Sequence, residues 1–266
     1  MKPAMSLYSY GGDIRTGRMA VRDAIEHAAS LGVKAVELVD EQHLPDWPYT
    51  SAAQIIELKS RIKSLGMEVC CFSTYLPDLI RSDRRATVAE IIEAAKKRIV
   101  IADLLETRIV RPAYIGTGFN DLAAVIHASI PMLETCNLIW GIEIHAPYKP
   151  LDFLALYNHE FAGCRNVKLV PDFSCWQRKG LPGECGFESV DSLRKVVPIT
   201  AHVHGKAHTF DATGEEPNTP YGDLLSVLKE EGYKDYIVAE YEGWMFQDLP
   251  SREVAATHLD LIRRYL

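Results

Sequence analysis

The 266-residue sequence predicts a single-domain (β/α)8 barrel, and three observations support that prediction. The chain has the length of closed α/β barrels, which typically run to about 250 residues. Amphipathic helix patterns alternate with short apolar strand patterns, an order that requires parallel strands covered by helices. No Gly/Ser/Pro-rich linker or low-complexity tract divides residues 1–266, so we expect one domain.

The first units show the alternation most clearly. Residues 4–10, AMSLYSY, are predicted to form the first strand. Residues 21–31 carry apolar side chains at helical spacing, Gly32 ends that helix, and residues 33–40 have a strand pattern. Residues 55–65 repeat the helix, Gly66 ends it, and a strand begins at Met67. Each unit is therefore a helix, a glycine stop and a strand.

The remaining units follow in the same order. Predicted helices at 88–105, 122–133, 151–157 and 190–197 precede the strand segments TRIVRP, LIWGIEIHAP, NVKLVPDFS and ITAHVHGK. A helix ending at Gly232 precedes a strand at 236–240, and residues 254–266 form the last helix. The total is eight strands and eight helices. An open doubly wound sheet is the alternative, but YSYGGDIRTGR lacks the G-x-G-x-x-G spacing expected after its first strand.

Composition excludes several classes of protein. With 47% hydrophobic and 24% charged residues the chain is globular, and no apolar run approaches the roughly 20 residues of a membrane helix. The N-terminus lacks the apolar stretch of a secretory signal, so we expect a cytoplasmic protein. A net charge of −7 argues against a nucleic-acid surface. The cysteines form no C-x-x-C pair and are expected to be reduced thiols: Cys70, Cys71, Cys136, Cys164, Cys175 and Cys185.

Ionisable side chains gather at the predicted C-terminal ends of the strands, where barrel enzymes place their catalytic groups. The segment AHVHGK is the densest example, since alternation places two histidines and a lysine on one strand face. The residues of this kind, in strand order, are Glu37, Asp40, Arg111, Glu143, His145, Asp172, His202, His204, Lys206, Glu240 and Glu242.

Four of these residues, one from each of strands five to eight, have the chemistry of a metal site: Glu143, Asp172, His204 and Glu240. Three carboxylates buried together would repel one another, and a divalent cation is the simplest remedy. Mixed oxygen and nitrogen ligands suit Mn²⁺, Mg²⁺, Co²⁺ or Zn²⁺. Taken alone, a glutamate at a strand end is about as often a solvated charge or the partner of an arginine as it is a metal ligand. The coincidence at four successive strand ends favours the metal site.

Such a site predicts a chemistry. A cation bound to a carbonyl oxygen acidifies the proton on the neighbouring carbon, which Glu143 and Glu240 could remove and return as catalytic acid and base. Lys206 and Arg111 are expected to hold hydroxyl, carboxylate or phosphate groups of a small-molecule substrate. Glu37, His145 and Glu242 are predicted as further substrate contacts.

The segments SLYSY, LGVKAVELVD, GIEIHAP, LVPDFS, HVHGKAHTFDATGEEPNTPYGDLLSVLKEEGY and IVAEYEG resemble the sugar phosphate isomerase/epimerase family, a group with the xylose isomerase-like TIM barrel. The resemblance implies one catalytic divalent metal, with Mn²⁺ favoured. It implies His204 and Glu240 as ligands, alongside the strand-five Glu and strand-six Asp. One departure matters: many epimerases of the group carry a substrate-contacting His where this chain has Cys175.

Three functional classes follow. The preferred one is a metal-dependent isomerase or epimerase of a sugar or sugar derivative. The second is a lyase on the same scaffold, either a keto-polyol dehydratase or a subunit that cleaves C-glycosides. The third, an endonuclease IV-type repair enzyme, needs three zinc ions and additional histidines on early strands; none there would serve, and the pI near 5.7 is acidic. The sequence leaves a homo-oligomer or a hetero-subunit partner open.

Overall fold

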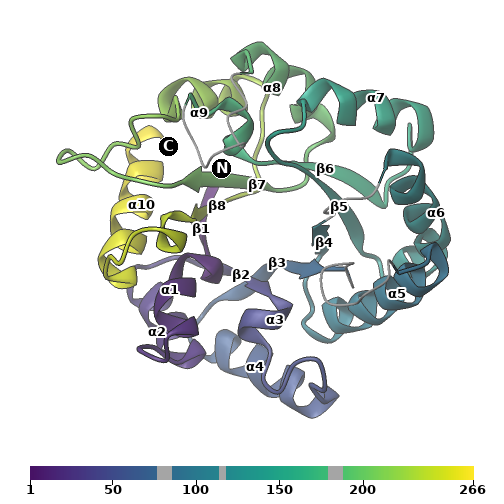
Figure 1. The fold of residues 1–266 in the computed structure, drawn as a ribbon, viewed down its shortest axis with the longest axis horizontal. Helices are drawn as coiled ribbons and strands as arrows, with labels where there is room; N and C mark the ends of the chain where they lie inside the picture. The colour runs from purple at the N-terminus through teal and green to yellow at the C-terminus, as the bar shows by residue number, and fades with distance from the viewer. Residues whose placement is uncertain (77–85, 114–117, 179–187) are drawn as a thin grey trace.

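The computed structural model describes residues 1–76, 86–113, 118–178 and 188–266. Its strands form one eight-stranded sheet in the order β6-β5-β4-β3-β2-β1-β8-β7, and all pairs are parallel. Isolated bridges between Leu169 and Thr200 and between Asp172 and His204 join the two edges into a nearly closed barrel. Helices surround the strands (Figure 1). The predicted (β/α)8 fold is confirmed.

The strands are β1 (Lys2–Ser6), β2 (Ala35–Val39), β3 (Glu68–Tyr75), β4 (Ile109–Ala113), β5 (Ile139–Ile144), β6 (Val167–Pro171), β7 (Val203–Ala207) and β8 (Tyr236–Tyr241). The α-helices are α1 (Gly11–Arg15), α2 (Val21–Ser30), α3 (Asp40–His43), α4 (Ala52–Ser64), α5 (Val88–Leu104), α6 (Phe119–Thr135), α7 (Pro150–Glu160), α8 (Val190–Val196), α9 (Tyr221–Glu230) and α10 (Ser251–Tyr265). Short 3₁₀ turns are η1 (Leu7–Tyr10), η2 (Phe173–Trp176), η3 (Val197–Ile199) and η4 (Gly243–Met245).

Helix ends follow the local sequence. The Ser51 hydroxyl caps α4 by accepting a hydrogen bond from the backbone amide of Gln54. Gly32, Gly66 and Gly232 all adopt positive φ, between 73° and 79°, just beyond α2, α4 and α9. Glycine adopts this left-handed conformation without strain and so ends a helix cleanly. The predicted glycine stops are therefore confirmed.

The first strand differs from its prediction. It runs over Lys2–Ser6, and the chain then turns into η1 rather than continuing extended to residue 10. Every residue of η1 is buried. An unbroken buried run gives no periodicity that would separate a strand from a turn.

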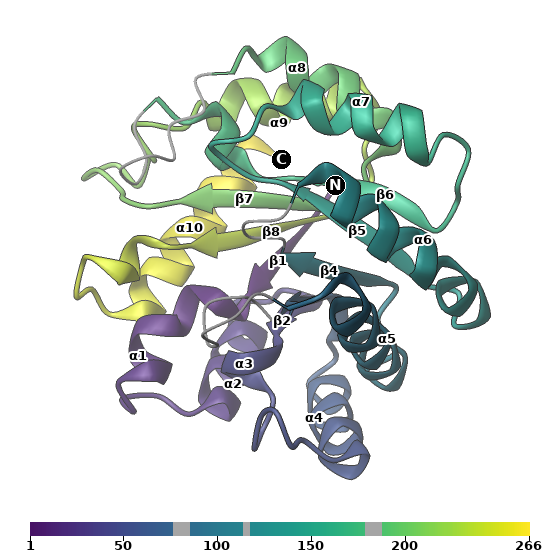
Figure 2. The ribbon, with the colours of Figure 1, turned by 45° about the vertical axis from the view of Figure 1, so that its right-hand side comes forward.

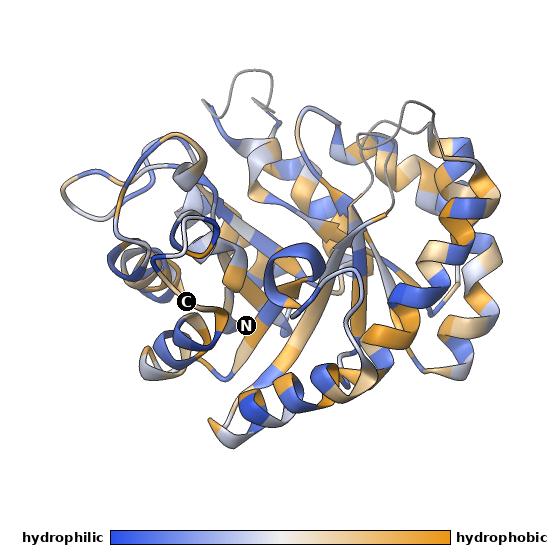
Figure 3. Cartoon of the chain, turned by 60° about the horizontal axis from the view of Figure 1, so that its bottom comes forward, coloured by the Kyte–Doolittle hydropathy of each residue, from blue (hydrophilic) through white to orange (hydrophobic). Residues whose placement is uncertain are grey.

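The helices pack their apolar faces on the outside of the barrel. In Figure 2 they flank the strands, and in Figure 3 hydrophilic and hydrophobic segments alternate along each helix, as amphipathic helices require. Gly205 of β7 shows how closely the helices approach the barrel, because a Cβ there would lie 3.3 Å from Ile262 Cδ1 of α10 and 3.4 Å from the Tyr221 hydroxyl of α9. His204 and Lys206, its neighbours on the strand, point to the opposite, inner face.

Two smaller expectations can be compared with the structure. No helix in the described part of the chain is long and apolar enough to cross a membrane. The five cysteines within the described residues are free, and Cys185 lies outside those residues.

Candidate metal centre and substrate pocket

The C-terminal ends of β5 to β8 bring the four predicted ligands together around one imidazole nitrogen. The Nδ1 atom of His204 lies 3.0 Å from Glu143 Oε1 and 2.9 Å from Glu240 Oε2. It lies 3.5 Å from Asp172 Oδ2. The His204 and Asp172 side chains are fully buried, and those of Glu143 and Glu240 are 12% and 6% exposed. The four groups thus share one small volume at the base of the barrel mouth.

The cluster leaves atoms without hydrogen bonds. Asp172 Oδ2, Glu240 Oε2 and His204 Nδ1 are buried, and none has a hydrogen-bond partner among the described residues. Candidate ligand atoms of Glu143, Asp172 and His204 lie within 4.8 Å of one another. Buried polar atoms without partners are costly, and a hard divalent cation accepts this set of oxygens and one nitrogen. The residues therefore fit a bound divalent ion.

Two cations flank the cluster. Arg111 Nη1 donates to Glu143 Oε2 at 2.7 Å, and Lys206 Nζ donates to Glu240 Oε1 at 3.1 Å. Lys206 Nζ also lies 3.3 Å from Asp172 Oδ2. Each of the two glutamates therefore turns one oxygen toward the cluster and the other toward a cation.

These contacts set the charge states of the groups. Burial opposes the charged form of Glu143, yet Arg111 and His204 outweigh it and lower the pKa of that carboxyl to about 2. Burial likewise opposes the charged form of Lys206, but Asp172 and Glu240 raise the pKa of its ammonium well above the usual range. Both side chains are charged at neutral pH.

A cavity of about 360 Å³ opens above the cluster. Its polar lining includes Arg111, Glu143, His145, Lys206, Glu240 and Glu242. Tyr8 and Tyr75 form part of its apolar wall, as does a group of aromatic rings from the β5 and α6–α7 region that sequence reasoning missed: Phe119, Trp140, Tyr148 and Phe153. These rings belong to β5, α6, α7 and the segment between β5 and α7, whose approach to one another at the mouth depends on the fold, so no local motif marks them.

The remaining predicted substrate contacts occupy different depths. Glu242 lies at the cavity, where it accepts hydrogen bonds from Tyr8 and Lys206 at 2.9 and 2.8 Å. His145 also lies there, with Nδ1 2.6 Å from the Ala146 carbonyl oxygen. Glu37, also expected at the substrate, is instead fully buried below the cluster, does not line the cavity, and pairs with His202 and His204.

Two further strand-end residues lie apart from the cluster. Asp40 pairs with Thr74 and lies 3.7 Å from Arg98, outside the cavity lining. Cys175 is fully buried, and its Sγ lies 3.5 Å from the carbonyl oxygens of Ile144 and Tyr148. Burial, followed by the charge of Asp172, raises the pKa of this thiol well above its usual value, which fits packing rather than nucleophilic chemistry.

Comparison with known proteins agrees with this architecture. The model of the family described as "Xylose isomerase-like TIM barrel" matches residues 25–265. A 3'-dehydrocarminate deglycosidase alpha subunit from Microbacterium sp is 22% identical over 332 aligned positions, which cover 98% of this chain and 94% of that protein. A C-glycoside deglycosidase alpha subunit from Microbacterium trichothecenolyticum is 47% identical over 62 residues, 23% of this chain and 17% of that protein.

Solved structures show the same fold. A D-allulose 3-epimerase from Methylomonas sp. superposes with a TM-score of 0.75 at 16% identity and covers 100% of this chain and 98% of its own. A probable 3-DHS dehydratase from Bacillus anthracis has a TM-score of 0.68 at 16% identity, with 99% of both chains covered. At such identities the similarity concerns the fold alone.

Proposed function

Because the chain belongs to the xylose isomerase-like TIM barrel family, we propose that it is a divalent-metal-dependent isomerase or epimerase of a sugar or sugar derivative. The observation that carries the proposal is that His204 Nδ1, which has no hydrogen-bond partner in the described part of the chain, faces three carboxylates beneath a cavity with polar groups. Glu143, Asp172, His204 and Glu240 would hold the ion, for which we favour Mn²⁺.

When bound, the ion supplies positive charge beside a substrate carbonyl oxygen, which acidifies the adjacent C–H group. The protein's own side chains move the proton. Glu143 and Glu240 come from β5 and β8 and border the cavity, so that one accepts the proton and the other returns one to the carbon or its neighbour. Arg111 and Lys206 donate hydrogen bonds to these two carboxylates and hold them in orientation.

The test is solvent isotope exchange. The full chain, freed of metal by a chelator and resupplied with Mn²⁺, is incubated in deuterated water with ketoses, inososes and 3-keto-glycosides. We expect deuterium in a recovered isomer, and the Glu240→Gln variant, which keeps the side-chain shape without the base, should incorporate none. If no substrate in the panel exchanges a proton while the protein holds Mn²⁺, the proposed chemistry is wrong.

A lyase is the second candidate, and two observations favour it. The relatives that match by sequence are named deglycosidase alpha subunits. The cavity also has an aromatic side, where Phe153 packs edge-on against Phe119 and Tyr148 at ring-centre distances of 5.1 and 5.9 Å. Such rings offer an apolar surface to an aromatic leaving group.

In this reaction the same proton is removed next to a ketone already present on the sugar. The electron pair then expels the substituent on the next carbon, and the departing group takes up a proton. No net oxidation occurs. Release of a free aglycone from a 3-keto-C-glycoside, without deuterated isomer, would assign the chain to this class.

The name alpha subunit on these relatives also supports assembly with a second subunit. The segment after β8 exposes Met245, Phe246 and Leu249, at 53%, 50% and 43%, beside the cavity residue Glu242. Light scattering on the purified chain alone separates a homo-oligomer from a monomer that awaits a different subunit.

A further inference from the structure

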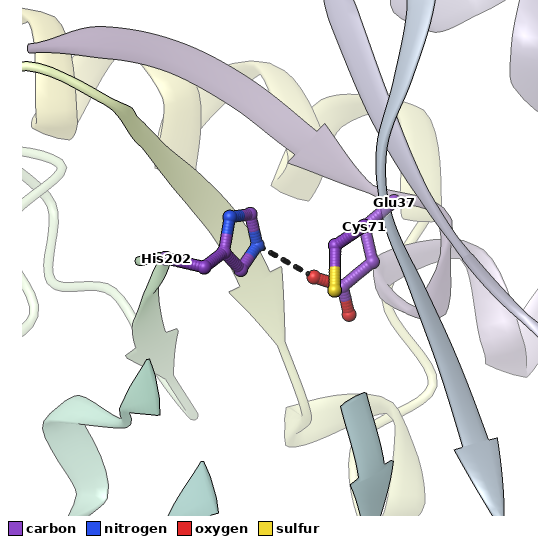
Figure 4. Close-up of side chains that lie close together, drawn as sticks. All are labelled: Glu37, Cys71 and His202. Atoms are coloured by element: carbon purple, nitrogen blue, oxygen red, sulfur yellow. Dashed lines mark hydrogen bonds and ion pairs between the residues drawn. The ribbon is translucent and has the colours of Figure 1, made fainter. Parts of the chain in front are cut away.

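One buried carboxylate lies below the candidate metal centre and outside the cavity lining. Glu37 stands on β2, has no exposed surface, and accepts a hydrogen bond on Oε2 from His202 Nε2 at 2.8 Å. Figure 4 shows this pair together with the neighbouring thiol of Cys71. The same Oε2 lies 3.1 Å from His204 Nε2. Because it is fully enclosed, Glu37 cannot touch a substrate, so its carboxylate must act on other side chains of the protein.

The first group served is His204. A neutral imidazole carries one proton, and a carboxylate beside Nε2 holds the proton there, which leaves a lone pair on Nδ1. That Nδ1 is the atom that faces Glu143, Asp172 and Glu240. We propose that Glu37 is a positioning residue that fixes the orientation and tautomer of the metal ligand His204, an inference that rests on the proposed metal site.

The second group served is Glu143, through two intermediates. The Ser73 hydroxyl donates to Glu37 Oε1 at 2.8 Å and accepts from Arg111 Nε at 2.9 Å. Arg111 Nη1 then donates to Glu143 Oε2 at 2.7 Å. A single carboxylate on β2 thus braces ligands that stand on β5 and β7. Such support holds ligands close to the geometry that binding requires.

A second metal ion is the competing explanation. Ligand-type atoms of Glu37, Cys71 and His202 lie within 4.8 Å of one another, and all three residues are buried. The hydrogen bonds favour the positioning role, because both oxygens of Glu37 already accept from side-chain donors. The thiol of Cys71 lies 3.8 Å from the Ser73 hydroxyl and is not needed for this arrangement. Cys71→Ala is therefore a matched control from the same cluster.

The test measures metal affinity rather than activity. Wild type, Glu37→Gln and Cys71→Ala chains are stripped with a chelator and titrated with Mn²⁺, and the free ion is followed by electron paramagnetic resonance. We expect a single ion in all three proteins, with affinity weaker by about 10–100-fold in Glu37→Gln. Cys71→Ala should match wild type. Co²⁺-loaded Glu37→Gln should also show a shifted visible absorption spectrum, because the His204 ligand has turned.

Each outcome is decisive. Equal Mn²⁺ affinity in wild type and Glu37→Gln overturns the positioning role and leaves the proposed function intact, whereas a wild type that binds no ion overturns the proposed function. If wild type binds two Mn²⁺ ions and Cys71→Ala binds only one, the second metal site is established instead. If Glu37→Gln fails to fold, Ser73→Ala removes the hydroxyl that joins Glu37 to Arg111 and leaves both histidine contacts of Glu37 in place, and its Mn²⁺ affinity should fall by up to about tenfold. Unchanged affinity there would exclude the brace to Glu143.

Discussion

Asp172→Asn is expected to weaken metal binding strongly and so to remove most of the stability that Mn²⁺ adds to the protein. Asp172 Oδ1 accepts the Ser174 amide proton at 2.7 Å, a bond that an asparagine oxygen can keep. Its Oδ2 accepts no hydrogen bond from the residues that the structure describes, and it lies 3.5 Å from His204 Nδ1 and 3.3 Å from Lys206 Nζ. The substitution therefore removes one charge from the cluster and little of the shape.

The metal-free and the Mn²⁺-bound protein should respond differently to the Asp172→Asn substitution. Without metal, burial opposes the charge of Asp172, but Lys206, His145 and His204 outweigh it and hold the pKa of this carboxyl well below its usual value, so the neutral asparagine should lower Tm in chelator. With Mn²⁺ at 100 times its Kd, wild type should gain about 2.7 kcal/mol of stability. For a chain of this size that gain raises Tm by about 5–10 °C. A loss of about 100-fold in affinity also corresponds to about 2.7 kcal/mol, so nearly all of the gain should vanish in the variant.

The assay is thermal unfolding of both proteins in chelator and in Mn²⁺. Asp191→Asn, an exposed substitution in the first turn of α8, is the control and should keep the full Mn²⁺ response. A variant that gains as many degrees from Mn²⁺ as wild type would remove Asp172 from the ligand set. The Tm in chelator is each protein's own baseline, so only the rise from chelator to Mn²⁺ decides the role of Asp172.

Three further outcomes are expected. Glu240→Asp should keep most of its Mn²⁺ affinity but lose about 10²-fold in kcat, because a shorter side chain withdraws the reacting oxygen by about 1 Å; full activity would exclude Glu240 as the base. Lys206→Met should bind Mn²⁺ at least as tightly as wild type in calorimetry, since a neighbouring cation is gone, while KM rises; loss of metal would make Lys206 structural. Burial lowers the pKa of His258 to about 3, so the ring is neutral when folded and gains a proton on unfolding below its unfolded pKa. Stability should thus fall as pH drops from about 6.5 toward 3, by about 2 kcal/mol at pH 5 from this residue. The urea midpoints measured at pH 7 and at pH 5 should differ less in His258→Gln than in wild type. An equal drop of the midpoint in both proteins would contradict this assignment.

The barrel and the meeting of the four candidate ligands could be predicted because each depends on local patterns. Alternating helices and strands fix the direction of every strand, and direction alone puts the residues that end β5 to β8 at one mouth. The structure brings Glu143, Asp172, His204 and Glu240 together as that reasoning requires. That they hold a metal stays a prediction.

How deep a side chain lies within the barrel could not be predicted from local patterns. Glu37 was expected at the substrate, but the register between β2 and β3 shifts between Val36 and Glu37. An irregularity of this kind changes which residues face one another across the two strands. Its partners Ser73, His202 and His204 are distant in sequence, and nothing in the LGVKAVELVD segment indicates which of them it meets.

Cys175 shows how the site differs from the family pattern that the sequence resembles. In many epimerases of that group a histidine at this place contacts substrate. Here the thiol is buried against the carbonyl groups of Ile144 and Tyr148, and no described residue of β6 or η2 lines the cavity. The segment from β6 to η2 therefore contributes Asp172 alone to the candidate site. Polar contacts that the histidine would make must come from other elements, and His145 at the end of β5 and Glu242 after β8 already border the cavity. Substrate preference should accordingly follow these two residues.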